Sequence, residues 1–331
     1  MVGFGRRKEL PELIKDKVEG YKKSNLRRFE DLRVEDHKGH TRAFLKVQEG
    51  CDLCCTYCIV PSLRGSQVRS KPLSQVKEEF INLLQRGFFE IVFTGTHLGA
   101  YGKDIGLDLV TLLEEMLTIE QPFRLRLSSL EPQEADEKLI TVMEKDPRLA
   151  RHLHLSLQSG SSKILRVMGR PYSREEYLGR IEMIRSRIVG IGISTDIMIG
   201  FPGEEEEDFL YTLDAMKRAG FVRVHLFPFS PRPHTPASKM TRIKPKIIKE
   251  RMKRAQENAH SSFLSYASTK IGNTLEVLTE RKKGDYLIGY SSEYLKVKFP
   301  GGPSHKHLHP VFIHGIEGDG LVGVCQDVLT G

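Results

Sequence analysis

A strand-like segment followed by a helix-like segment recurs six times between residues 43 and 269, and this repeat constrains the fold most. Short apolar or alternating runs predict the strands, and amphipathic stretches of helical periodicity predict the helices. Strands joined through helices form right-handed βαβ units with a parallel sheet. Six such units predict an α/β fold that is an open, partial (βα)6 version of the eight-unit barrel. The expected strands are residues 43–48, 90–96, 124–130, 152–158, 193–201 and 223–230, and the expected helices are 73–85, 107–117, 134–145, 174–187, 205–218 and 246–269.

Polar and glycine-containing stretches follow four of the expected strands. In barrels of parallel strands, the chemistry lies at the carboxyl ends of the strands and on the loops that follow them. The sequence therefore predicts one active site built by several strands. The stretches are TGTHLG from residue 94, SSLEP from 128, QSGS from 158 and GFPGE from 200.

The residues on either side of the repeat differ from it. Residues 1–40 are charged and too few for a core of their own, so we expect a linker segment. From Gly272 onward, short strands alternate with glycine-rich turns, which predicts a small all-β barrel of a kind often used on nucleic acid. The expected organisation is therefore a linker at 1–40, the partial barrel with its basic C-terminal helix at 41–270, and the small barrel at 271–331.

Charge and hydropathy limit the partners and the cellular location that the chain can have. The net charge is +8, and the basic run at 242–254 fits either a solvated surface or a nucleic-acid partner. No apolar run approaches the ~18–20 residues that span a membrane, and the N-terminus lacks the apolar stretch of a secretory signal. We therefore expect a cytoplasmic location, where thiols stay reduced.

Four of the five cysteines lie within CDLCCTYC, residues 51–58. Structural zinc usually takes two separated pairs, and the fifth cysteine, Cys325, stands alone in the tail. A thioredoxin-like pair does not suit six parallel units. The interpretation that remains is Cys51-x3-Cys55-x2-Cys58, three thiolates for three irons of a [4Fe–4S] cluster, with Cys54 outside the spacing.

This spacing, directly after the first expected strand, resembles that of radical S-adenosylmethionine (SAM) enzymes. The resemblance implies that the fourth iron binds the amine and carboxylate of SAM, and that one electron splits the sulfonium to give a 5′-deoxyadenosyl radical. The surrounding residues resemble the methylthiotransferase family within this group, and the tail resembles the RNA-binding TRAM domain. The motifs are VQEGCDLCCTYCIVPSLRGSQVRS (47–70), TGTHLGAYGKD (94–104), RLSSLEP (126–132), LSLQSGS (155–161), MGRPYS (168–173), DIMIGFPGE (196–204) and FSPRPHTPA (229–237).

The resemblance also implies roles for individual residues. Cys51, Cys55 and Cys58 would bind the cluster. A second set of residues, Arg170 and those given at the end of this paragraph, would bind SAM. Of these, Arg170 would face a carboxylate or phosphate, and His97 and His234 have weaker claims to the site. The expected SAM contacts are Tyr57 beside the adenine, Thr94 and Gly95 at the methionine amine, Ser129, Glu131 and Gln158 at the ribose or methionine part, and Gly200, Pro202 and Gly203 near the adenine.

TGTHLGAYG is more similar to the enzymes that methylthiolate C2 of N6-threonylcarbamoyladenosine at position 37, beside the tRNA anticodon. The implied partners are tRNA and an electron donor of the flavodoxin or ferredoxin type. Two alternatives stay open. The first is a radical SAM enzyme of the same group that acts on another tRNA adenosine or on a protein side chain. The second is a non-catalytic RNA-binding module with a structural iron–sulfur cluster.

The sequence departs from the family at its beginning. Full-length methylthiotransferases start with a domain that carries three more cysteines and a second [4Fe–4S] cluster, which supplies the sulfur. The first 50 residues here contain no cysteine. We therefore expect the chain to correspond to the family from its linker onward, as a truncated or a natural short form, and sulfur insertion is not expected of the chain alone.

Overall fold

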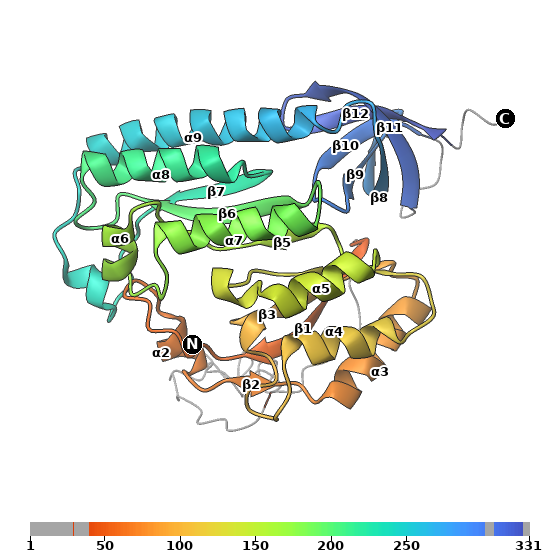
Figure 1. Cartoon of the computed structure of the whole chain (residues 1–331), viewed down its shortest axis with the longest axis horizontal. Helices are drawn as coiled ribbons and strands as arrows, with labels where there is room; N and C mark the ends of the chain where they lie inside the picture. Colours follow the sequence, from red (N-terminus) through yellow and green to blue (C-terminus); the bar gives the residue numbers. More distant parts are fainter. Residues whose placement is uncertain (1–28, 30–39, 302–307, 327–331) are drawn as a thin grey trace, which may run out of the picture.

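The computed structural model describes residues 29, 40–301 and 308–326 (Figure 1). The expected linker at 1–40 lies outside the described residues except for Phe29 and His40.

Six parallel strands form the partial barrel in the expected order, which confirms the predicted fold class. A first sheet has the order β2-β1-β3-β4, with the short β2 antiparallel to β1, and a second has the order β5-β6-β7. Isolated parallel bridges, Leu125 with Leu149 and Leu130 with Leu155, join the two sheets. The strands are β1 (Arg42–Glu49), β2 (Arg69–Ser70), β3 (Glu90–Gly95), β4 (Arg124–Leu127), β5 (His152–His154), β6 (Gly192–Ile199) and β7 (Arg223–Pro228).

Two strands end three or four residues earlier than expected. The third ends at Leu127 rather than at residue 130, and the fourth ends at His154 rather than at 158. At the last residue expected in the fourth strand, Gln158 has a φ of 67°, in the left-handed region that extended strands do not use. The freed segments remain tied by single hydrogen bonds, such as Leu130 N to His154 O at 2.9 Å. These irregular ends face the catalytic edge predicted from the sequence.

The expected helices are present, and polar caps fix where several of them begin. Asp108 accepts a hydrogen bond from the backbone N–H of Thr111, and Ser173 forms a capping box with Glu176. Two short helices, α2 and α6, were not expected. The helices of the partial barrel are α2 (Val60–Arg64), α3 (Leu73–Gln85), α4 (Leu109–Leu117), α5 (Glu137–Lys145), α6 (Ser162–Val167), α7 (Arg174–Arg187), α8 (Glu206–Ala219) and α9 (Pro245–Ser268).

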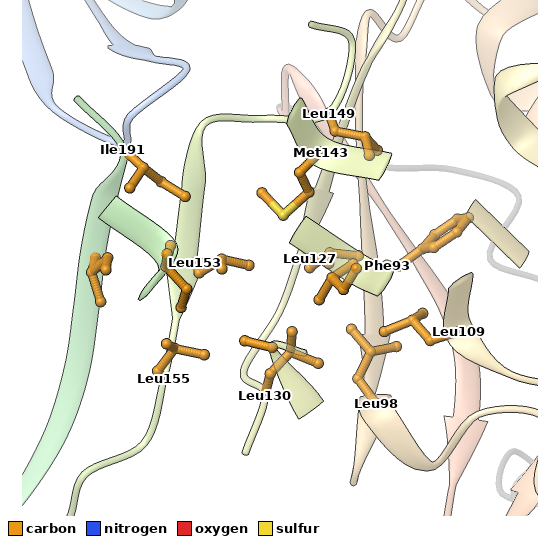
Figure 2. Close-up of a cluster of buried hydrophobic side chains, with 14 of the residues drawn as sticks. Phe93, Leu98, Leu109, Leu127, Leu130, Met143, Leu149, Leu153, Leu155 and Ile191 are labelled. Atoms are coloured by element: carbon orange, nitrogen blue, oxygen red, sulfur yellow. The ribbon is translucent and has the colours of Figure 1, made fainter. Parts of the chain in front are cut away.

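The main core lies between the strands and the helices that cover them. Alternate residues of each strand point to these helices, and Figure 2 shows Phe93, Leu127 and Leu153 in this layer. Residues one position away, such as Arg126 and His154, point to the inner face of the partial barrel. The inner face is therefore polar along much of its length.

The tail forms a closed five-stranded barrel with the order β10-β12-β11-β8-β9, as the sequence predicts. Its core includes Val222 at the start of β7 and Ala267 at the end of α9, so it packs directly on the partial barrel. Figure 1 shows it at one end of α9, on the opposite side of the molecule from α2. Its strands are β8 (Thr274–Lys283), β9 (Tyr286–Ser291), β10 (Lys296–Pro300), β11 (Leu308–Glu317) and β12 (Gly320–Cys325).

An arginine cluster, consisting of Arg42, Arg124 and Arg126 around Glu90, joins the two barrels. The four residues lie at the amino ends of β1, β3 and β4. Arg124 and Arg126 also donate hydrogen bonds to backbone carbonyls of the tail barrel, for example Arg126 Nη1 to Ser292 O at 3.0 Å. Tyr294, in the turn before β10, packs against His152 with ring centroids 4.8 Å apart. The tail barrel thus covers the amino end of the partial barrel.

Among the described residues, no helix combines the length and the apolar character needed to cross a membrane.

Candidate functional site

The cysteine loop, residues 50–59, follows β1 and is fixed at both ends. Gly50 has a φ of 81°, and a Cβ there would lie 1.9 Å from the carbonyl oxygen of Gln67, so this position requires glycine. The buried Gln48 amide donates to Gly50 O at 2.8 Å. Farther along, Thr56 N donates to Met168 O at 2.9 Å. The start of the loop is thus held by the first strand and its middle by the end of α6.

Two of the three predicted ligand sulfurs accept a hydrogen bond from a nearby donor. Arg170 Nη1 donates to Cys55 Sγ at 3.3 Å, and Val60 N donates to Cys58 Sγ at 3.4 Å. The third sulfur, of Cys51, interacts with the His97 ring and helps to raise the pKa of that ring. By contrast, Cys54 is exposed. Hydrogen bonds to sulfur stabilise the thiolate form that ligates iron.

These residues fit a [4Fe–4S] cluster in their donor chemistry. Burial raises the pKa of the Cys58 thiol, and the nearby Cys55 and Cys51 act in the same direction. Three thiolates this close repel one another because each carries a negative charge. Bound iron offsets these charges and so stabilises the thiolate form. In the described part of the chain, no three His, Cys, Asp or Glu side chains converge on a single metal ion. A cluster does not require this, because its thiolates bind different irons.

A buried ion pair borders the cysteine loop. Arg170, which donates to Cys55, also pairs with the carboxylate of Glu131, and its Nε donates to the hydroxyl of Tyr172 at 2.9 Å. Burial raises the pKa of Glu131, although the charge of Arg170 opposes this. Two residues predicted to contact SAM, 39 positions apart in the sequence, therefore meet beside a predicted iron ligand.

The aromatic side of the loop is formed by Tyr57. Its ring meets that of Phe201 edge to face, with centroids 6.4 Å apart, in a small apolar cluster with Met198 and Phe229. Gly200, in the same segment as Phe201, has a φ of 76°, and its N–H donates to Glu204 Oε1 at 3.2 Å. The structure thus places Gly200 and the buried Pro202 near Tyr57, whereas Gly203 is exposed with open space around it.

The other predicted contacts lie at the ends of β3, β4 and β5. Thr94 and Gly95 end β3, and a Cβ on Gly95 would lie 2.8 Å from Gln48 Oε1. Ser129 is exposed. Gln158 is buried, and its Oε1 has no hydrogen-bond partner among the described residues. The buried Oγ of Ser128 likewise has no hydrogen-bond partner among the described residues.

His97, which has a weaker claim to the site from sequence, is held between two carboxylates beside the cysteine loop. Its Nδ1 lies 2.7 Å from Asp52 Oδ1, and its Nε2 lies 2.5 Å from Glu134 Oε1. Burial favours the neutral ring, but hydrogen bonds with Cys51 and Glu134 prevail and raise the pKa of His97 to about 10. The stretch TGTHLG gave the only sequence signal for this contact. His234, the other histidine with a weak claim, is exposed.

A second polar network, on the inner face of β5, β6 and β7, was not predicted. His154 Nε2 lies 3.2 Å from Asp196 Oδ2, and His225 Nδ1 lies 3.0 Å from Asp196 Oδ1. The hydroxyl of Ser194 lies 2.8 Å from His152 Nε2. Alternation along HLHLS, STDIM and RVHLF could have placed these side chains opposite the core face, since each strand has a period of two.

Comparison with known proteins agrees with this geometry. The family model described as the Radical SAM superfamily matches residues 45–216, which span β1 to most of α8. The fold and the site thus define a radical SAM protein, a class that uses a [4Fe–4S] cluster and SAM.

Curated relatives narrow the class. The "Threonylcarbamoyladenosine tRNA methylthiotransferase MtaB" of Thermotoga maritima is 39% identical over 88% of this chain and 67% of its own length. Its namesake from Bacillus subtilis is 35% identical over 82% of this chain and 62% of its own length. The "tRNA-2-methylthio-N(6)-dimethylallyladenosine synthase" of Aquifex aeolicus is 37% identical over 89% of this chain and 69% of its own length. The chain belongs to the methylthiotransferase family of radical SAM proteins.

Solved structures show the same fold at low identity. The radical SAM methyltransferase TsrM from Kitasatospora setae, solved with cobalamin and a [4Fe–4S] cluster, is 19% identical. It superposes with a TM-score of 0.51 over 59% of this chain and 36% of its own. Methylornithine synthase (PylB) gives a TM-score of 0.50 at 16% identity over 67% of this chain and 62% of its own.

Proposed function

We propose that the chain is the catalytic part of a tRNA-modifying enzyme that methylthiolates C2 of N6-threonylcarbamoyladenosine at position 37. The observation that carries the proposal is the set of three cysteines in the loop after β1, with hydrogen-bond donors on the sulfurs of Cys55 and Cys58. Relatives named for threonylcarbamoyladenosine support the choice of nucleoside. Relatives named for dimethylallyladenosine support a second candidate, the isopentenylated adenosine.

In this proposal Cys51, Cys55 and Cys58 hold the cluster. A cluster held there supplies the electron that reductively cleaves SAM, delivered by a flavodoxin- or ferredoxin-type donor. The charge of Arg170 stabilises the Cys55 thiolate, and Glu131 keeps that guanidinium oriented. The unpartnered oxygens of Ser128 and Gln158 are available to the polar parts of SAM. Tyr57, Gly200 and Pro202 form the side proposed for the adenine.

We further propose that the functional division follows the boundaries expected from the sequence, with residues 41–270 for SAM chemistry and 271–331 for RNA binding. Sulfur insertion requires a sulfur source outside the cysteine loop, because three of its four cysteines serve one cluster and Cys54 is too close to them to anchor another. Cys325 is buried in the tail barrel.

The test uses tRNA whose position-37 adenosine carries the threonylcarbamoyl group and deuterium at C2. The reconstituted chain is incubated anaerobically with SAM and dithionite, and the 5′-deoxyadenosine is analysed by mass spectrometry. We expect deuterium in the 5′-deoxyadenosine, because hydrogen is removed from C2. Deuterium transfer only from isopentenylated tRNA would favour the second candidate. No 5′-deoxyadenosine from a chain that holds iron would support a non-catalytic module.

A further inference from the structure

His97 joins the cysteine loop to the turn that follows β4. Its Nδ1 lies 2.7 Å from Asp52 Oδ1, and its Nε2 lies 2.5 Å from Glu134 Oε1. The His97 side chain is only 5% exposed, although Asp52, next to Cys51 in the loop, is 41% exposed. The two nitrogens of a buried ring thus face carboxylates from two separate segments. We call His97, Asp52 and Glu134 the histidine clamp.

The backbone of His97 is also held in place. Its N–H donates to Gln48 Oε1 at 2.8 Å, and the amide nitrogen of the same glutamine donates to Gly50 O at the start of the cysteine loop. Gln48 lies at the end of β1 and is fully buried. The His97 ring therefore has little freedom to turn away from the loop, because its backbone is bonded to Gln48 while both ring nitrogens face carboxylates.

Gly99 provides the space for the Glu134 carboxylate. A Cβ on Gly99 would lie 2.0 Å from Glu134 Cδ, so a larger residue there would displace this side chain. Gly99 does not have a positive φ, so the contact with Glu134, rather than backbone strain, disfavours a side chain at this position. On its other side, Glu134 Oε2 accepts from the backbone N–H of Glu131 at 2.9 Å. The carboxylate that faces His97 is thus fixed from two directions.

One 3₁₀ turn after β4 holds two side chains at the cysteine loop. Glu131, at the start of this turn, pairs with Arg170, which donates to Cys55 Sγ. Glu134, at its end, contacts His97. The turn therefore orients both side chains together, one on each side of the loop, although they come from distant parts of the sequence.

The position of the His97 ring indicates which property of a bound cluster it would control. The ring interacts with Cys51, the first of the predicted iron ligands. The reduction potential of an iron–sulfur cluster depends on hydrogen bonds to its sulfurs and on its surroundings. A buried N–H group beside a ligand sulfur stabilises the reduced cluster more than the oxidised one, because the reduced cluster carries one more negative charge. Such a ring therefore makes the cluster easier to reduce.

We propose that His97 is a positioning residue that raises the reduction potential of the [4Fe–4S] cluster through Cys51, with Asp52 and Glu134 fixing its ring. This inference rests on the proposed function in one respect, the assignment of the three cysteine ligands. It concerns the step in which the cluster accepts an electron, before SAM is cleaved. It does not depend on which nucleoside is modified.

The test measures the midpoint potential of the reconstituted cluster by redox titration, in which electron paramagnetic resonance detects the reduced cluster. His97→Leu removes both ring nitrogens, whereas His97→Gln keeps one N–H donor. Gly99→Ala keeps every charge and displaces the Glu134 carboxylate. The matched control is Gly179→Ala in α7, which has open space around it and no positive φ.

We expect His97→Leu to shift the potential to more negative values and Gly99→Ala to shift it in the same direction by less. His97→Gln should restore part of the difference, because one donor remains. The Gly179→Ala control should have the potential of the unchanged protein. Iron content is measured in every variant, so that a lost cluster is distinguished from a cluster with an altered potential.

Two results would overturn the proposal. The first is an unchanged potential in His97→Leu and Gly99→Ala at full iron content. The second is loss of iron in His97→Leu together with an unchanged potential in His97→Gln and Gly99→Ala, since the histidine clamp would then only hold the loop. The measurement needs no tRNA. If the potentials shift as expected and deuterium transfer from C2 fails, the histidine clamp stands and the proposed function does not; unchanged potentials with deuterium transfer give the reverse.

Discussion

Glu90 is the carboxylate on which the joint between the two barrels depends. Its side chain is fully buried, and its Oε1 accepts from Arg126 Nε at 2.9 Å. It also contacts Arg124, and Arg42 Nη1 lies 3.8 Å from its Oε1. Burial alone would raise the pKa of Glu90, but the arginines lower it from 4.5 to about 2. Glu90→Gln therefore leaves Arg124 and Arg126 with no buried counter-charge, whereas Arg42 keeps its ion pair with Glu280 at 2.6 Å.

The loss of folding stability expected for Glu90→Gln can be estimated in two ways. A pKa lowered from 4.5 to about 2 corresponds to roughly 3 kcal/mol of stability, since each pH unit is worth about 1.4 kcal/mol. Removing one partner of a buried ion pair typically costs about 3–5 kcal/mol. We therefore expect Glu90→Gln to lower the free energy of unfolding by about 3–4 kcal/mol at pH 7. For a lowered carboxylate pKa this stability is present above pH 4.5 and is lost as the pH falls toward 2.

The assay is urea unfolding of the apo chain at pH 7 and at decreasing pH, followed by circular dichroism. Glu257→Gln serves as the control, since its carboxylate is exposed on α9 and pairs only loosely with Lys253, at 4.0 Å. The control should change stability by less than about 0.5 kcal/mol. A Glu90→Gln variant no less stable than this control at pH 7, or a difference that persists unchanged near pH 2, would refute the reasoning.

Three further predictions concern the site. Alanine at any of the three predicted cysteine ligands should abolish the iron–sulfur absorbance after anaerobic reconstitution, whereas Cys54→Ala should keep it; loss in the Cys54 variant alone would show that the ligand register is wrong. Gly50→Ala should prevent cluster assembly, because its Cβ would meet a backbone carbonyl at 1.9 Å. Gly87→Ala, with a similar φ of 86° and open space, should keep the cluster and lose only about 1 kcal/mol of stability; equal iron content in both glycine variants would contradict the steric argument. The reconstituted chain should hold about four irons, those of one [4Fe–4S] cluster, and form no 2-methylthio nucleoside; about eight irons per chain, or a methylthiolated product by mass spectrometry, would reveal a sulfur source among its residues.

The fold could be predicted from sequence because its signals are local. The tail barrel, for example, begins with β8 at Thr274, close to Gly272, where the sequence predicts the change to short strands and glycine-rich turns. The irregular ends of β4 and β5 could not be predicted in this way. Gln158 adopts a left-handed φ that its residue type does not indicate, and LSLQ has the alternation of an ordinary strand.

The candidate site was predictable where residues cluster in the chain and much less where they meet only in space. The cysteine spacing is a local pattern, so the ligand set could be proposed at once. The pairing of Arg170 with Glu131 depends on how α6 follows β5, and no spacing encodes it. The arginine cluster shows the same limit. Arg42, Glu90 and Arg124 resemble ordinary charged strand ends until the parallel register places them side by side.

Tyr294 has a consequence for the access of water. Its ring lies 4.9 Å from the guanidinium of Arg126 and 4.8 Å from the His152 ring, on the inner face where the strands begin. Tyr294 therefore covers the amino end of the partial barrel. A radical is quenched when it takes hydrogen from a molecule other than the substrate. A site with few openings to solvent therefore has fewer such side reactions. Because Tyr294 covers this end, solvent and substrate are expected to reach the inner face from the carboxyl ends of the strands.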